Sequence, residues 1–216
     1  MDIKVNKNTA LVFDLDDTLY NELDFLKSAF REISSTLDPM NKNILFVKMF
    51  SLYRSGENAF EYLVKNYEAD LANILYQYRS HFPSITPFPG VKEVFSQIKE
   101  KNGKIGVVTD GRESTQVNKL KALGLFGQID HLVISETVGQ EKPSLENFKV
   151  VEDHLRVEDY YYFGDNFKKD FIAPLKLGWQ TVGLIDNGMN VHSHHHTYME
   201  NGPKKLINSF QEINII

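Results

Sequence analysis

Cysteine is absent from the 216-residue chain, which excludes disulfide bonds and thiolate metal sites and is compatible with a reducing compartment. No apolar run approaches the length of a membrane span, and the first nine residues lack the apolar core of a signal peptide. Basic residues are outnumbered, 24 against 29 acidic ones, and form no long run, so a nucleic-acid-binding surface is not indicated. We therefore expect a cytoplasmic protein with no nucleic acid or membrane partner, and a monomer by default.

Glycine is nearly absent between residues 20 and 82, where Gly56 stands alone. Apolar residues recur there at helical spacing in four successive segments. In the second of them the apolar set is Ile44, Phe46, Val47, Phe50 and Leu52. Proline and glycine then cluster at residues 83–90, as in a connection to a different domain. This pattern predicts an all-helical unit over residues 20–87, inserted in a larger domain formed by residues 1–19 and 88–216.

Helical and strand patterns alternate from residue 91 onward. The predicted helices cover residues 91–101, 114–123, 145–155 and 171–177. The predicted strands cover residues 10–13, 104–109, 131–135, 160–163 and 181–185. Such alternation implies right-handed crossovers and a mostly parallel sheet that is covered on both faces. The expected fold class is therefore α/β, a parallel sheet core with an inserted all-helical unit.

The last part of the chain carries a histidine cluster at residues 192–196 and an apolar pattern at residues 203–210. Clustered imidazoles can bind metal, but no carboxylate accompanies these, so a solvated loop is favoured. The pattern of residues 203–210 predicts a final helix.

The first predicted strand ends in carboxylates, with Asp14, Asp16 and Asp17 directly after the apolar run. Asp14 and Asp16 have the period-two spacing that points side chains to one side of an extended backbone. Two ionised carboxylates about 4 Å apart repel by about 4 kcal/mol at an effective dielectric constant of about 20. They therefore need a cation, a shared proton or solvent. The alternative is an acidic helix cap and turn.

Other predicted strands and connections also lead into polar residues, namely Thr109, Asp110, Gly111, Lys142, Asp165 and Asp170. Each has an ordinary explanation, such as a turn, a solvated lysine or a helix cap. The C-terminal ends of parallel strands, however, meet at one edge of a sheet, where open α/β sheets place their ligand sites. We therefore expect these residues to converge on Asp14 and Asp16.

The combined set contains the parts needed for phosphoryl transfer. Asp14 would be the nucleophile, because a carboxylate can form an acyl phosphate that water later cleaves. Asp16 would protonate the leaving alkoxide and then deprotonate the water. Lys142 would balance charge in the transition state, and Asp170 would orient Lys142.

The same set offers the hard oxygen ligands that Mg²⁺ prefers, from Asp14, Asp165 and a backbone carbonyl near Asp16. A metal there would shield the phosphate from the attacking carboxylate. Thr109 and the amides of Asp110 and Gly111 would hold a non-bridging phosphate oxygen.

Four segments in register resemble the motifs of the haloacid dehalogenase (HAD) superfamily: residues 13–19, residues 107–111, Lys142-Pro143, and Gly164-Asp165 through Asp170. The resemblance covers the chain in order and implies a Rossmann-like core, Mg²⁺ and an aspartyl-phosphate intermediate, with the roles assigned above. It also implies that the helical unit is a C1-type cap, which opens and closes over the active site. One departure is Ser144, which follows Pro143 where the superfamily more commonly has a second proline or an aspartate.

Asp16 favours a phosphatase, because the true dehalogenases of the superfamily lack this second acid. Residues 14–20 are similar to those of pyrimidine 5′-nucleotidases and acylneuraminate phosphatases, so the expected substrate is a small phosphorylated metabolite, a nucleotide or a sugar phosphate. Two alternatives stay open: a phosphomutase of the same superfamily, and a non-catalytic binding module that kept the fold. The residues able to reach or stack on a substrate are Tyr20, Tyr53, Arg54 and Arg112.

Overall fold

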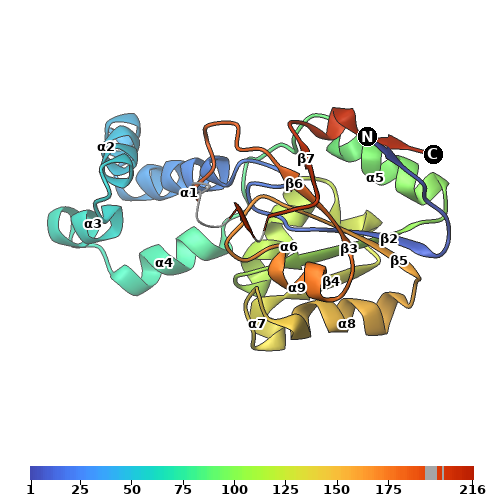
Figure 1. Cartoon of the computed structure of the whole chain (residues 1–216). Helices are drawn as coiled ribbons and strands as arrows, with labels where there is room; N and C mark the ends of the chain where they lie inside the picture. The colour runs from blue at the N-terminus through green and yellow to red at the C-terminus, as the bar shows by residue number, and fades with distance from the viewer. Residues whose placement is uncertain (193–198, 201) are drawn as a thin grey trace.

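A six-stranded sheet forms the centre of the computed structural model, which describes residues 1–192, 199, 200 and 202–216. Its order is β4-β3-β2-β5-β6-β7, and every neighbouring pair is parallel (Figure 1). The strands are β2 (Thr9–Phe13), β3 (Lys104–Thr109), β4 (His131–Ile134), β5 (Asp159–Gly164), β6 (Gln180–Leu184) and β7 (Lys205–Ile207). This confirms the predicted α/β fold with a parallel, Rossmann-like sheet.

Helices cover both faces of the sheet (Figure 1). On one face α5 (Val91–Glu100) and α6 (Glu113–Ala122) contribute to the larger apolar core, and on the other face α8 (Leu145–Leu155) and α9 (Ile172–Lys176) form a second core. Two short elements, η1 (Phe126–Gln128) and α7 (Ser135–Val138), flank β4 in the chain. The chain ends pair as β1 (Asp2–Ile3) and β8 (Asn214–Ile215), a small parallel sheet beside α5.

Strand β2 lies between β3 and β5, and all five of its residues are buried. A strand that is covered on both faces has apolar residues at successive positions. Residues 10–13 therefore show no alternation of apolar and polar residues. Phe13, its last residue, contacts the rings of Phe95 and Phe163 at centroid distances of 4.9 Å and that of Phe210 at 6.1 Å. These contacts anchor the end of β2, and the chain that follows it is therefore held in place.

Four helices, α1 (Glu22–Leu37), α2 (Lys42–Arg54), α3 (Ala59–Tyr67) and α4 (Leu71–Ser80), lie together beyond one end of the sheet, on the left of Figure 1. They share an apolar core of their own. The existence of four helices agrees with the sequence pattern, although not all the apolar residues that indicated α2 face the core. Leu45, Met49 and Leu52 are buried, whereas Ile44 and Val47 are exposed. The spacing of the apolar residues on α2 allows either of two faces to be buried. Contact with α1 and α3 decides which face is buried.

The predicted final helix over residues 203–210 was wrong. Residues Lys205–Ile207 form β7, which pairs with β6, and Phe210–Glu212 forms the short helix η3. The apolar residues Leu206, Ile207 and Phe210 fit a helical spacing, but the open edge of β6 offers backbone hydrogen bonds that a helix would leave unused. Residues 193–196 of the histidine cluster lie outside the described residues. No helix in the described part of the chain is long and apolar enough to cross a membrane.

We expect Phe13→Ala to lower the free energy of unfolding by about 3–5 kcal/mol, because it removes a fully buried ring from a close-packed aromatic cluster. Urea denaturation followed by circular dichroism measures this loss. Phe82→Ala is the matched control, since the Phe82 side chain is largely exposed. A loss below about 1 kcal/mol for Phe13→Ala would show that the cluster does not support the sheet in this way.

Candidate active site

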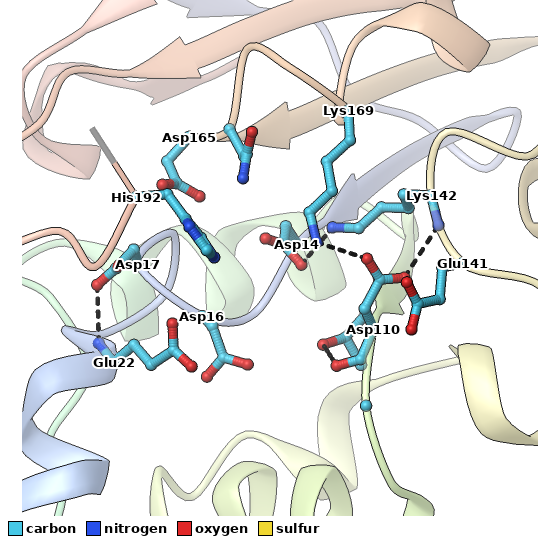
Figure 2. Close-up of a pocket in the computed structure, with 13 residues that line it drawn as sticks. Asp14, Asp16, Asp17, Glu22, Asp110, Glu141, Lys142, Asp165, Lys169 and His192 are labelled. Carbon is cyan, nitrogen blue, oxygen red and sulfur yellow. Dashed lines mark hydrogen bonds and ion pairs between the residues drawn. The ribbon is translucent and has the colours of Figure 1, made fainter. Parts of the chain in front are cut away.

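A pocket opens at the C-terminal ends of β2, β3 and β5, and Figure 2 shows the side chains that line it. Seven of the eight residues that the sequence pointed to line this pocket: Asp14, Asp16, Thr109, Asp110, Gly111, Lys142 and Asp165. The eighth, Asp170, is completely buried and contacts Lys142. The parallel sheet thus brings together residues that are more than 150 positions apart in the chain.

The Lys142 ammonium lies between two carboxylates. Its Nζ is 2.6 Å from Oδ1 of Asp14 and 2.7 Å from Oδ1 of Asp170, and it also lies 3.3 Å from the hydroxyl of Tyr162. Burial disfavours the charged lysine, but the two carboxylates outweigh it and raise the pKa of Lys142 well above its usual value. Lys142 therefore stays a cation inside the protein.

Asp14 begins where β2 ends, and its amide donates to the carbonyl of Phe163 at 2.8 Å. Burial raises the pKa of Asp14 to about 7, against the lowering effect of Lys142. In the absence of any further cation, Asp14 is therefore protonated more readily than an exposed aspartate. Additional positive charge near Asp14 would favour the carboxylate form that a nucleophile needs.

The Asp170 carboxylate is held by hydrogen-bond donors of the backbone and by Lys142. Its Oδ2 accepts hydrogen bonds from the amides of Asp165 and Asn166, at 3.2 and 2.9 Å. Gly164 leaves the room for this, because a Cβ at that position would lie 2.6 Å from Oδ2 of Asp170. Both carboxylate oxygens of Asp170 are thus engaged, one by Lys142 and one by the backbone.

Oxygen atoms of Asp14, Asp165 and Asp170 all lie within 4.8 Å of one another. Asp165 accepts hydrogen bonds from Thr18 at 3.3 Å and Asn190 at 2.9 Å, but none of the described residues forms an ion pair with it. Burial, together with the neighbouring carboxylates, raises the pKa of Asp165 well above its usual value. Buried hard oxygen ligands with this excess of negative charge fit a divalent cation such as Mg²⁺.

The Asp16 side chain is not part of this acidic group. Its carboxylate lies 2.7 and 2.9 Å from the ammonium of Lys119 and 3.0 Å from the side-chain amide of Gln116, and it also accepts from the hydroxyl of Tyr20. Burial alone would raise the pKa of Asp16, but Lys119 and these hydrogen bonds hold it below the ordinary value. The side chain of Asp16 is therefore occupied. Only its backbone remains available to bind a metal that lies beside Asp14 and Asp165.

The segment after β3 is tied to its surroundings by Asp110. One carboxylate oxygen accepts from the amide of Lys142 at 3.0 Å, and the other pairs with the ammonium of Lys169 at 2.6 Å. The amide of Gly111, which has φ +126°, donates to the hydroxyl of Ser135 at 2.9 Å. Asp110 and Gly111 therefore shape the loop beside the pocket, while the hydroxyl of Thr109 faces the amide of Gln116 at 2.6 Å.

Four residues in or beside the pocket escaped the sequence analysis. Glu22 and Lys169 line it, whereas Gln116 and Lys119 contact the Asp16 carboxylate. Glu22 reaches the pocket from the first turn of α1, and its amide donates to Asp17 at 2.8 Å. Burial and the nearby Asp16 raise the pKa of Glu22 to about 8. The position of Lys169 directly before Asp170 was the available signal for that residue. No motif marked the other three.

The four residues proposed to reach a substrate do not line the pocket in the described part of the chain. Tyr20 is fully buried against Asp16, and Tyr53 lines a separate cavity among the helices of the α1–α4 unit. Arg112 pairs with Glu136 at 3.2 Å on the surface, and Arg54 is exposed at the end of α2. The position of a residue in the sequence does not tell in which direction its side chain points.

Comparison with known proteins identifies the family. The family model for haloacid dehalogenase-like hydrolases matches residues 11–184. Glyceraldehyde 3-phosphate phosphatase of Methanocaldococcus jannaschii is 31% identical over 192 residues, covering 82% of this chain and 84% of the relative.

Solved structures agree on the fold. A putative β-phosphoglucomutase from Thermotoga maritima has a TM-score of 0.65 at 19% identity and covers 92% of this chain and 93% of its own. A putative HAD-hydrolase of Bacillus subtilis bound to magnesium has a TM-score of 0.63 at 22% identity, with coverage of 96% and 97%. The sequence motifs, the fold and the matching family model lead to one conclusion: this chain belongs to the haloacid dehalogenase-like hydrolases.

Proposed function

We propose that the chain is a Mg²⁺-dependent phosphomonoester hydrolase that acts on a small phosphorylated metabolite through an aspartyl-phosphate intermediate. The observation that carries this proposal is the placement of Asp14, which directly follows β2, lines the pocket, pairs with Lys142 and lies beside Asp165. The kinship with a glyceraldehyde 3-phosphate phosphatase over most of the chain favours a sugar phosphate over a nucleotide. The pocket, about 260 Å³ in volume, suits such a small ligand.

In the first step a carboxylate oxygen of Asp14 attacks the phosphorus atom of the ester, and the bond from phosphorus to the leaving oxygen breaks. The electron pair of that bond goes to the leaving oxygen, which takes a proton from Asp16 and departs as an alcohol. The Lys142 ammonium, 2.6 Å from Asp14, offsets the negative charge of the phosphoryl group as it arrives.

In the second step water attacks the phosphorus atom of the aspartyl phosphate, and Asp16 accepts a proton from that water. The acyl–phosphate bond breaks, which releases inorganic phosphate and restores the Asp14 carboxylate. Thr109 lines the pocket beside Asp14 and holds a non-bridging phosphate oxygen during both steps. Asp170, through its 2.7 Å contact with Lys142, keeps that ammonium aimed at Asp14.

The side chains of Asp14 and Asp165 would hold the metal, with the backbone carbonyl of Asp16 as a further ligand. Asp170 is the less suitable ligand, because the amides of Asp165 and Asn166 and the ammonium of Lys142 already occupy its oxygens. When bound, Mg²⁺ supplies positive charge that offsets the repulsion between the phosphate and the Asp14 carboxylate.

We also infer that residues 20–87 form a cap that selects the substrate, since Glu22 at the start of α1 lines the same pocket as Asp14. A cap excludes water from the reacting groups and brings side chains to the leaving group. Among the described residues of this unit, Glu22 lines the pocket, whereas Tyr53 and Arg54 do not.

Phosphate release is the direct test. We expect the wild-type protein to release inorganic phosphate from glyceraldehyde 3-phosphate in the presence of Mg²⁺, with at least a hundredfold loss in EDTA. Asp14→Asn should abolish turnover because it removes the nucleophile and keeps the shape of the side chain. A malachite green assay over a panel of sugar phosphates, nucleotides and p-nitrophenyl phosphate measures both effects.

Asp153→Asn is a matched control, because Asp153 is exposed on α8, away from the pocket. Retained activity in Asp14→Asn would contradict the mechanism. Isomerised sugar phosphate without net phosphate release, in the presence of a bisphosphate activator, would identify a mutase instead. Mg²⁺ binding without any turnover of the panel would favour a non-catalytic module.

Asp165→Asn tests the metal site separately. We expect this variant to need at least tenfold more Mg²⁺ for half-maximal activity, because a neutral amide replaces a charged hard ligand. Thermal unfolding supplies a readout that is independent of turnover: Mg²⁺ should raise the melting temperature of the wild type more than that of Asp165→Asn. Equal stabilisation of both proteins by Mg²⁺ would place the metal elsewhere.

A further inference from the structure

Positive and negative side chains are unevenly distributed around the pocket. The lysines among its described lining residues, Lys142 and Lys169, lie on one side of it in Figure 2. Asp16, Asp17 and Glu22 lie on the other side, where the described lining contains no lysine or arginine. The two ends of a ligand in this pocket therefore meet different electrostatic surroundings.

The carboxyl group of Glu22 is open to a ligand. Glu22 is half-buried, lies in the first turn of α1 and lines the pocket. Its amide donates to Asp17 at 2.8 Å, which fixes the backbone at the start of the helix. None of the described residues forms an ion pair or a hydrogen bond with its carboxyl group. That group can therefore accept a hydrogen bond from a bound molecule.

The surroundings of Glu22 oppose further negative charge. Asp16 is offset by Lys119 at 2.7 Å, but none of the described residues forms an ion pair with Asp17, whose oxygens accept from backbone amides. Burial, followed by the charge of Asp16, raises the pKa of Glu22 to about 8, although Lys119 acts in the opposite direction. Surroundings that resist a negative charge on Glu22 also resist one on a ligand beside it.

His192, which also lines the pocket, does not supply the missing positive charge. Burial, followed by the charge of Lys169, lowers the pKa of His192 below its ordinary value of 6.5. The imidazole is therefore mostly neutral near pH 7.5. An anionic group that entered this side of the pocket would find no cation among the described lining residues.

The geometry of phosphoryl transfer directs the leaving group toward Glu22. In an in-line displacement the leaving group departs on the side of phosphorus opposite to the nucleophile. Asp14 directly follows β2, so the leaving group points away from the sheet and toward the α1–α4 unit, which lies beyond that end of the sheet (Figure 1). Among the described residues of that unit, Glu22 lines the pocket.

We propose that Glu22 is a specificity-determining residue that accepts a hydrogen bond from a hydroxyl of the leaving group and, with Asp17, disfavours a second negative charge there. The favoured substrates are neutral hydroxylated phosphomonoesters, such as aldose and polyol phosphates, rather than phosphorylated carboxylic acids or bisphosphates. The inference rests on the proposed function, because it requires the phosphoryl group to lie at Asp14. A carboxyl group accepts from a hydroxyl whether it is ionised or protonated, so this contact does not depend on the protonation of Glu22.

Two substrates that differ in one group test this selectivity. Glyceraldehyde 3-phosphate and 3-phosphoglycerate share three carbons, a hydroxyl and the phosphate, but the first carries an aldehyde where the second carries a carboxylate. We expect kcat/KM of the wild type to be at least tenfold higher for glyceraldehyde 3-phosphate, measured as release of inorganic phosphate. The ratio of the two kcat/KM values does not depend on the fraction of enzyme that is folded, so a partly unfolded variant remains informative.

Glu22→Lys places a cation where the carboxylate of 3-phosphoglycerate would lie. We expect it to lower the ratio of kcat/KM for glyceraldehyde 3-phosphate over 3-phosphoglycerate by at least tenfold, because attraction replaces repulsion. Glu22→Gln, which keeps the shape and adds no cation, should lower the ratio by a smaller factor. Glu32→Lys is the matched control: it makes the same change of charge at an exposed position of the same helix and should leave the ratio within about twofold of the wild-type value.

The outcomes separate this inference from the proposed function. Equal kcat/KM values of the wild type for the two substrates, or a preference for 3-phosphoglycerate, would overturn the inference while the proposed hydrolase stands. The same holds if Glu22→Lys leaves the ratio unchanged or moves it by no more than Glu32→Lys does. Absence of phosphate release by the wild type from both substrates and from p-nitrophenyl phosphate would instead overturn the proposed hydrolase, and the inference with it.

Discussion

The site depends on the two ion pairs that the buried ammonium of Lys142 forms with Asp14 and Asp170. The ammonium joins Asp14 at the end of β2 to Asp170 after β5, at distances of 2.6 and 2.7 Å. Removal of one partner from such a cluster leaves uncompensated buried charge, which costs about 3–5 kcal/mol. The backbone supports the arrangement from both sides: the amide of Lys142 is fixed by Asp110, and Asp170 is fixed by two amides that follow Gly164. Three segments far apart in the chain are thereby locked together around one charge.

Because these ion pairs use the charge of Lys142, the pocket contains more carboxylates than cationic groups. The lining contains the carboxyls of Asp14, Asp16, Asp17, Glu22, Asp110, Glu141 and Asp165, and its only lysines among the described residues are Lys142 and Lys169. Lys142 is shared between two carboxylates and Lys169 is paired with Asp110, so neither of them neutralises Asp165. Burial, together with the neighbouring carboxylates, raises the pKa of both Asp14 and Asp165. A phosphate monoester would add further negative charge, and this is the physical reason that a divalent cation belongs in the proposed mechanism.

Much of this arrangement could be predicted from the sequence, because it follows from strand patterns. A run of buried residues that stops at Asp14, and another that stops before Asp165, must deliver their acids to the same sheet edge if both strands are parallel. The helices posed a harder problem. Gln116 and Lys119 look like surface residues of an amphipathic helix, and only the packing of α6 turns them toward Asp16. The buried face of α2 and the strand at residues 205–207 could not be predicted for a similar reason. The local sequence allowed two arrangements equally well, and packing against neighbouring helices or pairing with β6 decided between them.

Helix α6 also links Asp16 to the helical unit. Thr115 donates to the carbonyl of Arg79 at 2.8 Å, and Asn118 donates to that of Ser80 at 3.1 Å, both in the last turn of α4. The same helix carries Lys119, whose ammonium touches both Asp16 and the ring of Phe25 on α1. Helix α6 thus contacts α1, α4 and the Asp16 carboxylate at the same time. The position of the Asp16 carboxylate therefore depends on how the helical unit packs against α6.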